Sequence, residues 1–245
     1  MRPKPLVTSA GALYVLDRHA AFVALSAMIN DACAGGPAAI ALSGGSTPLE
    51  YYAWAVHNHA VQPRTRDFAH WHVSDERCVP LDSDDSNFGN ASRALLDPLG
   101  ILPSKRHPWP VHVDPETAAT RYAAEMQVRP RGITYDVCLL GLGDDAHTAS
   151  LWPGCPLIGA PGGKLFAHTE WPGRGHRLTI TEAGLARCAK IVVLAFGAKK
   201  AGALKAVLEG GSNAKKYPAQ VLRQLQSKTV WLVDADAASE LTARA

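Results

Sequence analysis

The sequence predicts an α/β protein of Rossmann-like type, in which a mostly parallel sheet carries helices on both faces. Short, mostly apolar runs alternate with segments of helical spacing along the chain, and this alternation is typical of βαβ units. The length of 245 residues, 47% of them hydrophobic, suits one α/β domain and provides enough apolar side chains for a core. We therefore expect a single domain over residues 1–245.

Each expected strand is a short apolar run, and the expected helices lie between these runs. The strands are expected at Ala38–Ser43, His70–Ser74, Tyr135–Gly141, Lys190–Phe196 and Thr229–Val233. The helices are expected at Asp17–Cys33, Pro48–Val61, Asn87–Leu96, Pro115–Val128 and Lys199–Leu208. Thr47 and Asp114 each precede a proline, so both are expected to cap a helix that begins with that proline. The uncharged stretch Pro153–Gly163 is expected to be a surface loop rather than a linker between domains.

Composition excludes several classes of protein. The net charge is +3, which is too small to indicate a nucleic-acid or membrane-surface protein. The longest strongly apolar run, Ile191–Phe196, is far shorter than the roughly 20 residues that span a bilayer. The five cysteines form no CxxC pair, so we expect reduced, mostly buried thiols and no structural zinc. No signal peptide is expected, and the predicted location is the cytoplasm.

A glycine-rich turn follows the first expected strand and has the sequence Ser43-Gly44-Gly45-Ser46-Thr47-Pro48. Ligands of open parallel sheets bind beyond the carboxyl ends of the strands. Glycines let the backbone approach a ligand, and the first N–H groups of the next helix are unpaired donors. The turn therefore predicts a phosphate site at Gly44, Gly45, Ser46 and Thr47, with an ordinary βα turn as the alternative. It is not a P-loop, since no Gly-Lys-Ser/Thr follows.

A charged motif, Ser74-Asp75-Glu76-Arg77, follows the second expected strand. Its two carboxylates and its guanidinium are expected where a substrate would lie, although a local salt bridge is an equal alternative. Arg77 can bind a phosphate or carboxylate through two parallel hydrogen bonds. Asp85-Ser86-Asn87 has the pattern of a helix cap, and Asn87 could also reach the site.

A second glycine-rich turn presents two acids and a histidine, in Leu140-Gly141-Leu142-Gly143-Asp144-Asp145-Ala146-His147. His147 is the candidate general base, because imidazole takes up a proton near neutral pH. The carboxylate of Asp145 could hold the ring in one tautomer. The alternative is a structural histidine, one of ten in the chain. The turn also fits Gly-x-Gly-x-x-Ala, but its two acids oppose a bound pyrophosphate, so a dinucleotide site is not expected.

Other hydrolytic chemistries lack their motifs. The chain has no Gly-x-Ser-x-Gly elbow for a serine nucleophile and no HExxH metal motif. The segment Gly197–Lys228 carries seven lysines and arginines against a lone Glu209. These cations are expected on solvated helix faces, with the alternative that one or two line an anion site.

Taken together, these motifs are similar to those of the 6-phosphogluconolactonase family. The resemblance covers roughly residues 40–205, in the family's order. Its segments are Ser43–Pro48 (SGGSTP), Asp75–Pro80 with Ser86-Asn87 (DERxVP…SN), Leu140–Gly154 (LGxGxDGHTASLFPG), Arg177–Thr181 and Gly197–Lys200.

The resemblance implies the fold shared with glucosamine-6-phosphate deaminase and ribose-5-phosphate isomerase, and hydrolysis of 6-phospho-D-glucono-1,5-lactone in the pentose phosphate pathway. It implies that His147 activates water and that Asp145 orients it. It also implies that Arg77, Arg177, Lys200 and the glycine-rich loop hold the phosphate and the developing oxyanion, with Asp75 and Asn87 beside the substrate. The only implied partner is the sugar-phosphate lactone, without nucleic acid, membrane, metal or cofactor, and the expected state is a monomer or weak homo-oligomer.

Two departures from the family pattern concern the site. Ala146 stands where the family usually has Gly; if the position requires a positive φ, alanine is strained there by roughly 1 kcal/mol or more. Trp171–His176 stands where the family often has Lys-Pro-Pro, so the expected cation is either replaced by Arg174 or absent.

Two other functions remain as alternatives. Glucosamine-6-phosphate deaminases share the glycine-rich loop but typically have Asp-Glu-Tyr where this chain has Asp75-Glu76-Arg77. A sugar-phosphate sensor would use the same fold without catalysis, and would have no need of a base at His147.

Overall fold

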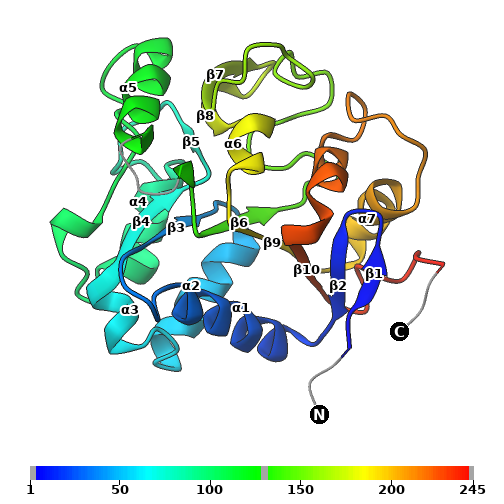
Figure 1. Cartoon of the computed structure of the whole chain (residues 1–245), viewed down its shortest axis with the longest axis horizontal. Coiled ribbons are helices and arrows are strands. Elements are labelled where there is room, and N and C mark those ends of the chain that lie inside the picture. Colours follow the sequence, from blue (N-terminus) through cyan, green and yellow to red (C-terminus); the bar gives the residue numbers. More distant parts are fainter. Residues whose placement is uncertain (1–3, 128–131, 243–245) are drawn as a thin grey trace.

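A seven-stranded sheet runs through the middle of the computed structural model, which describes residues 4–127 and 132–242 (Figure 1). The strand order is β1-β2-β10-β9-β6-β3-β4, and every neighbouring pair is parallel except β1 with β2. The strands are β1 (Leu6–Thr8), β2 (Gly11–Val15), β3 (Ala38–Leu42), β4 (Ala69–Val73), β6 (Val137–Gly141), β9 (Lys190–Ala195) and β10 (Thr229–Val233). The carboxyl ends of β3, β4, β6 and β9 therefore lie along one edge of the sheet.

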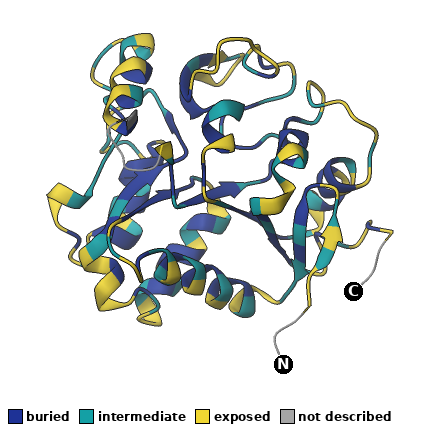
Figure 2. Cartoon of the chain, viewed as in Figure 1, coloured by how far each residue is buried: buried dark blue, intermediate teal, exposed yellow. Residues whose placement is uncertain are grey.

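Helices cover both faces of this sheet, as the sequence predicts. They are α1 (Arg18–Ala32), α2 (Ser46–His57), α3 (Pro63–Phe68), α4 (Asn87–Ala91), α5 (Pro115–Gln127), α6 (Glu182–Ala186) and α7 (Ala201–Leu208). A π turn extends α4 over Ser92–Leu96, and 3₁₀ turns occur at Pro103–Lys105, Ala198–Lys200 and Pro218–Lys228. In Figure 1, α1, α2 and α3 lie below the sheet, and α6 and α7 lie above it. The buried residues follow the sheet between these layers (Figure 2).

The five predicted strands and five predicted helices are confirmed, with ends that differ by a few residues; Val128, the predicted end of one helix, lies outside the described residues. Asp114 caps α5 as expected, because its carboxylate accepts hydrogen bonds from the N–H groups of Glu116 and Thr117 at 3.2 and 3.1 Å. The predicted cap at Thr47 is wrong. Helix α2 begins at Ser46, two residues before the predicted Pro48, and Gly45 occupies the cap position with a φ of 100°, a conformation that glycine adopts without strain.

A second sheet was not predicted from the sequence. It is antiparallel, in the order β5-β8-β7, and consists of β5 (Asp75–Arg77), β7 (Phe166–Trp171) and β8 (Gly175–Ile180). The chain passes into it directly from β4, because only Ser74 separates β4 from β5. The Ser74 carbonyl accepts a hydrogen bond from the Ile180 N–H of β8 at 2.9 Å. Its strands carry many polar residues because much of the β7–β8 hairpin is not buried. Periodicity and apolar content therefore do not identify them.

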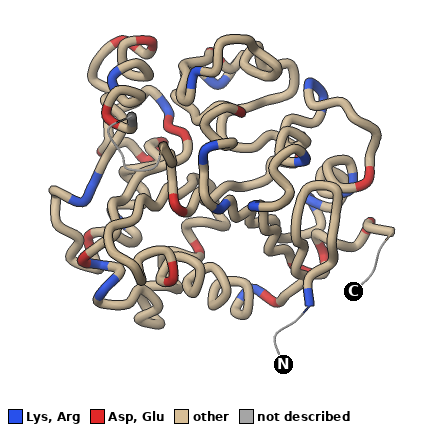
Figure 3. Tube along the Cα trace, in the orientation of Figure 1, with Lys and Arg blue, Asp and Glu red and all other residues tan. Residues whose placement is uncertain are grey.

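The state of the cysteines confirms the expectation of reduced, mostly buried thiols. All five cysteines are free, and four of them are buried. Acidic and basic positions are distributed over the whole trace (Figure 3). Within residues 4–127 and 132–242, no helix is both long enough and apolar enough to cross a membrane.

Glu76 is a buried carboxylate that joins β5 to the start of α4. It accepts hydrogen bonds from the N–H groups of Arg77, Asn87 and Phe88 at 2.7–2.8 Å, and from the Ser86 hydroxyl at 3.0 Å. Ser86 Oγ in turn accepts from the Gly89 N–H, which confirms the predicted helix cap. Burial raises the pKa of Glu76 above its usual value, although these hydrogen bonds oppose the shift. Glu76 thus holds α4, and with it Asn87, against the second sheet.

Replacing Glu76 tests this structural role. Both carboxylate oxygens of Glu76 accept hydrogen bonds, and in Glu76→Gln one of them is replaced by an NH₂ group, which cannot accept. We therefore expect the free energy of unfolding, measured by urea denaturation, to fall by roughly 1–3 kcal/mol. Glu50→Gln is the matched control, because Glu50 pairs with Arg18 in an exposed position and should cost about 1 kcal/mol or less. Equal stability losses in the two variants would contradict the assignment.

Candidate active site

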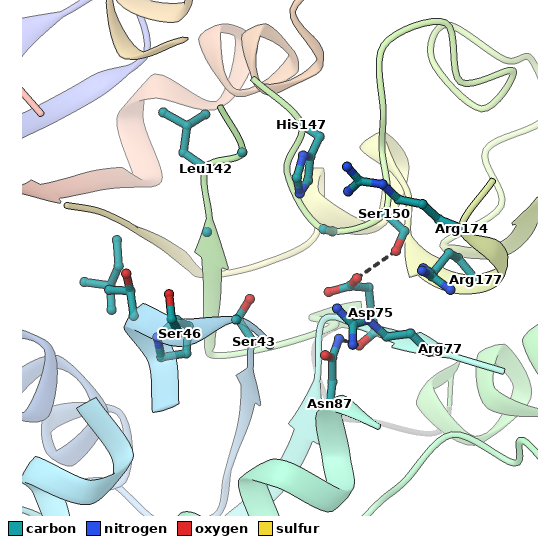
Figure 4. A pocket seen from close by; sticks show the side chains of 18 of the residues that line it. Ser43, Ser46, Asp75, Arg77, Asn87, Leu142, His147, Ser150, Arg174 and Arg177 are labelled. Atoms are coloured by element: carbon teal, nitrogen blue, oxygen red, sulfur yellow. Dashed lines mark hydrogen bonds between the residues drawn. The ribbon is translucent and has the colours of Figure 1, made fainter. Parts of the chain in front are cut away.

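A pocket of about 260 Å³ opens at the carboxyl ends of the central strands, beneath the second sheet. Its walls come from the loops after β3 and β6, from β5 and β8, and from the turn after β9. Ten of the residues predicted from the sequence line it, namely Gly44, Gly45, Ser46, Thr47, Asp75, Arg77, Asn87, His147, Arg177 and Lys200. Figure 4 shows His147 directed into this space from one side and Asp75, Arg77 and Asn87 from another. Asp145 lies outside the lining, behind His147.

The loop after β3 is fixed by its neighbours on both sides. The Tyr52 hydroxyl accepts from the Ser43 N–H at 3.0 Å and donates to the Ser43 carbonyl at 2.6 Å. A Cβ atom at Gly44 would lie 1.9 Å from Asn87 Oδ1, so this glycine is required by packing against Asn87. The N–H groups of Ser46 and Thr47, at the start of α2, have no carbonyl partner within the helix, and both residues line the pocket. The loop can therefore bind an anion.

Asp75 is held rigidly in the pocket wall. The Ser150 hydroxyl donates to Asp75 Oδ2 at 2.7 Å (dashed line in Figure 4), and the Ser74 hydroxyl donates to Oδ1 at 3.1 Å. The Asn87 amide donates to the Asp75 carbonyl at 2.9 Å. Ser150 also lines the pocket. It lies in the segment Leu140–Gly154 but is not among the predicted site residues.

Glu76 does not face the substrate space, which corrects the expectation that both acids of the charged motif lie there. Successive side chains of a strand point to opposite faces. Within β5, Asp75 and Arg77 therefore line the pocket, while Glu76 points to α4. The motif contributes one carboxylate and one guanidinium to the site.

Arg77 and Arg177 are direct partners in the antiparallel pairing of β5 with β8. Both line the pocket, and among the described residues neither forms an ion pair with a carboxylate within 4.0 Å. Arg77 donates instead to the Asp85 carbonyl at 2.5 Å. Burial and the neighbouring charge of Arg77 lower the pKa of Arg177 from its ordinary value. Two like charges held side by side in this way favour a bound anion.

His147 forms a close pair with Asp145. The two atoms Nδ1 and Oδ1 lie 2.6 Å apart, and Oδ1 also accepts from the His147 backbone N–H at 3.0 Å. Burial alone would raise the pKa of Asp145, but the hydrogen bonds and charge of His147 outweigh it and lower the pKa. An ionised Asp145 makes Nδ1 the donor, so the neutral ring carries its free electron pair on Nε2. The ring is thus arranged as a base.

The turn that carries this pair is tightly folded. A Cβ atom at Gly143 would lie 1.9 Å from His147 Nδ1, so only glycine fits there. Ala146 has a φ of 64°, which confirms that alanine occupies a left-handed position at a cost of about 1–2 kcal/mol. The residue is fully buried, and hydrogen bonds at its N–H to Gly143 and at its carbonyl from Ala219 hold it there.

Two further pocket residues lie at the tip of the β7–β8 hairpin. Trp171 ends β7, and Arg174 follows in the turn before β8. The Arg174 guanidinium lies 4.6 Å from the centroid of the Trp171 ring. Arg174 therefore places a cation in the pocket, where the sequence allowed either Arg174 or no cation in place of the family's Lys-Pro-Pro segment. Figure 4 shows Arg174 on the same side of the pocket as His147. Trp171 was missed because β7 was not recognised as a strand.

The basic segment after β9 contributes one cation to the pocket. Lys200 lines it and donates to Asp144 at 2.5 Å. Arg223 and Lys228 instead donate to backbone carbonyls at the carboxyl ends of α7 and α6 and just beyond them. Within the described parts of the chain, no group of three or more His, Cys, Asp or Glu side chains is arranged to hold a metal ion.

Comparison with known proteins agrees with this geometry. Residues 17–231 match the family model of glucosamine-6-phosphate isomerases and 6-phosphogluconolactonase. A 6-phosphogluconolactonase of Synechocystis is 36% identical over 90% of this chain and 92% of its own. The endoplasmic bifunctional protein GDH/6PGL of Oryctolagus cuniculus is 33% identical over 81% of this chain, which spans only 25% of that protein.

A solved structure of the devB protein has a TM-score of 0.82 and 28% identity, covering 94% of this chain and 99% of its own. The family match extends over most of the chain and includes every motif that lines the pocket. The chain therefore belongs to the glucosamine-6-phosphate isomerase/6-phosphogluconolactonase family.

Proposed function

We propose that this protein is a 6-phosphogluconolactonase, which hydrolyses 6-phospho-D-glucono-1,5-lactone to 6-phosphogluconate in the cytoplasmic pentose phosphate pathway. The observation that carries the proposal is the Asp145–His147 pair, whose imidazole lines the same pocket as the cations Arg77 and Arg177. The relatives named 6-phosphogluconolactonase support the choice of substrate. Arg77, where deaminases typically have tyrosine, favours this reaction over deamination.

In the proposed mechanism, His147 acts as a general base through Nε2. It removes a proton from a water molecule as the water oxygen attacks the lactone carbonyl, C1. The tetrahedral intermediate collapses when the bond from C1 to the ring oxygen breaks, and the protonated imidazole returns its proton to that leaving oxygen. Asp145 keeps Nδ1 as a donor and stabilises the imidazolium that forms during the reaction.

The substrate presents two negative groups, the phosphate and the oxyanion that develops at C1. The pocket offers the N-terminus of α2 with Ser46 and Thr47, the arginine pair on β5 and β8, and Lys200. We assign Arg177 to the phosphate, because its guanidinium lines the pocket and donates to the carbonyl of the preceding residue, His176, whereas that of Arg77 is held by the more distant Asp85 carbonyl. Fixed donors of this kind stabilise an oxyanion most when they are already in place before the reaction.

The activity itself is tested with the lactone generated enzymatically from glucose 6-phosphate. The purified protein should hydrolyse it faster than buffer does, and His147→Ala should lower kcat by about 10²–10⁴-fold. A rate no greater than the spontaneous one, or ammonia released from glucosamine 6-phosphate, would overturn the proposal. Normal turnover in His147→Ala would mean that another group accepts the proton.

Asp145→Asn tests the orienting role of the carboxylate. An asparagine oxygen can accept from Nδ1 but carries no charge to stabilise the imidazolium, so kcat should fall roughly 10- to 100-fold with little change in KM. Because the pKa of Asp145 is lowered in the folded protein, its contribution to stability is present above pH about 4 and is lost as the pH falls. The stability difference between wild type and variant should therefore shrink in acid. A difference that grows below pH about 4 would contradict the lowered pKa of Asp145.

Arg177→Gln tests the phosphate site. Loss of a charge-assisted hydrogen bond to phosphate should raise KM by about 10-fold or more and leave kcat within about threefold. The same kinetics on Arg77→Gln assign the second guanidinium, since KM rises alone if it binds phosphate and kcat falls if it stabilises the oxyanion. A fall in kcat at unchanged KM in Arg177→Gln would contradict its assignment to the phosphate.

A further inference from the structure

The imidazole of His147 has a second neighbour besides Asp145. The Trp171 ring lies edge to face with it, with centroids 4.9 Å apart and an interplanar angle of 78°. This is a favoured geometry for aromatic pairs. The contact joins the turn after β6, which carries the base, to the hairpin of the second sheet.

Trp171 is itself fixed in place. The Trp152 ring stacks with it at a centroid distance of 6.1 Å and an interplanar angle of 18°. The Arg174 guanidinium lies over its ring, and the Arg174 N–H donates to the Trp171 carbonyl at 2.8 Å. These contacts come from two separate parts of the chain, so the indole is held as a rigid wall beside His147.

The hydrogen bond to Asp145 does not by itself fix the imidazole. It restrains one ring atom, and both side chains remain partly open to solvent, with exposed fractions of 28% for His147 and 42% for Asp145. The ring can still rotate about the direction of that bond, which would move Nε2 away from the attacking water. Trp171 lies against the ring, where it opposes such a rotation.

We propose that Trp171 is a positioning residue, which holds the His147 imidazole so that Nε2 keeps its aim into the pocket. The proposal rests on the function proposed above, because it assigns His147 as the general base. Trp171 acts through that base and takes no part in the bonds that form and break. A small displacement of a catalytic group lowers the rate far more than it lowers affinity.

The kinetic test compares two substitutions at this position. Trp171→Leu removes the aromatic wall and should lower kcat roughly 10- to 100-fold with KM changed less than about threefold. Trp171→Phe keeps an aromatic ring beside His147 and should retain kcat within about threefold of wild type. The matched control is Trp54→Leu, because Trp54 lies edge to face with His19 at 5.4 Å and 78°, away from the pocket, and should leave kcat unchanged.

Two kinetic outcomes would overturn the proposal. A rise in KM at constant kcat in Trp171→Leu would mean that the indole contacts substrate rather than the base. Equal losses of kcat in the Leu and Phe variants would mean that an aromatic wall is not what the base requires.

A measurement without substrate separates this proposal from the proposed function. In NMR relaxation of the histidine rings without substrate, the wild-type His147 ring should be well ordered with Nδ1 held by Asp145, and Trp171→Leu should make the ring average over several orientations. An equally ordered His147 ring in that variant would overturn the positioning role. Absence of lactonase activity in the wild type would instead overturn the function and leave the NMR result standing.

Discussion

The hydrogen bond between Asp145 and His147 is the interaction on which the site depends, and the turn after β6 exists in its observed form to permit it. Gly143 leaves room for the imidazole, and Ala146 accepts a left-handed backbone so that the two side chains can meet. The strain at Ala146 is offset by its burial and by backbone hydrogen bonds at both ends of the residue. Strained backbone of this kind persists where the surrounding structure holds it.

The second sheet supplies a further wall at the carboxyl edge of the main sheet and so completes the pocket. Because the chain passes from β4 into β5 after Ser74, the alternation of side chains places Asp75 and Arg77 over the substrate space and Glu76 against α4. The pairing of β5 with β8 then brings Arg177 beside Arg77. The same few residues thus build a cationic wall and hold the helix that carries Asn87.

The parallel sheet, its helices and ten of the residues lining the pocket could be predicted, because buried strands are short apolar runs and because ligands gather at their carboxyl ends. The second sheet could not be predicted in this way, since β8 begins with exposed and polar residues and β5 has only three. For the same reason the sequence wrongly predicts Glu76 in the site and does not predict Trp171 there. Both depend on which face of a strand a side chain occupies, and that is set by pairing between segments distant in sequence.

The most direct test of the account is a crystal structure with the product, 6-phosphogluconate, bound. It should place the C1 carboxylate within hydrogen-bonding distance of His147 Nε2 and the phosphate against the guanidinium of Arg177. A product bound in the opposite direction, with its phosphate at His147 and C1 remote from that ring, would contradict the assignment of His147 as the base that activates the attacking water.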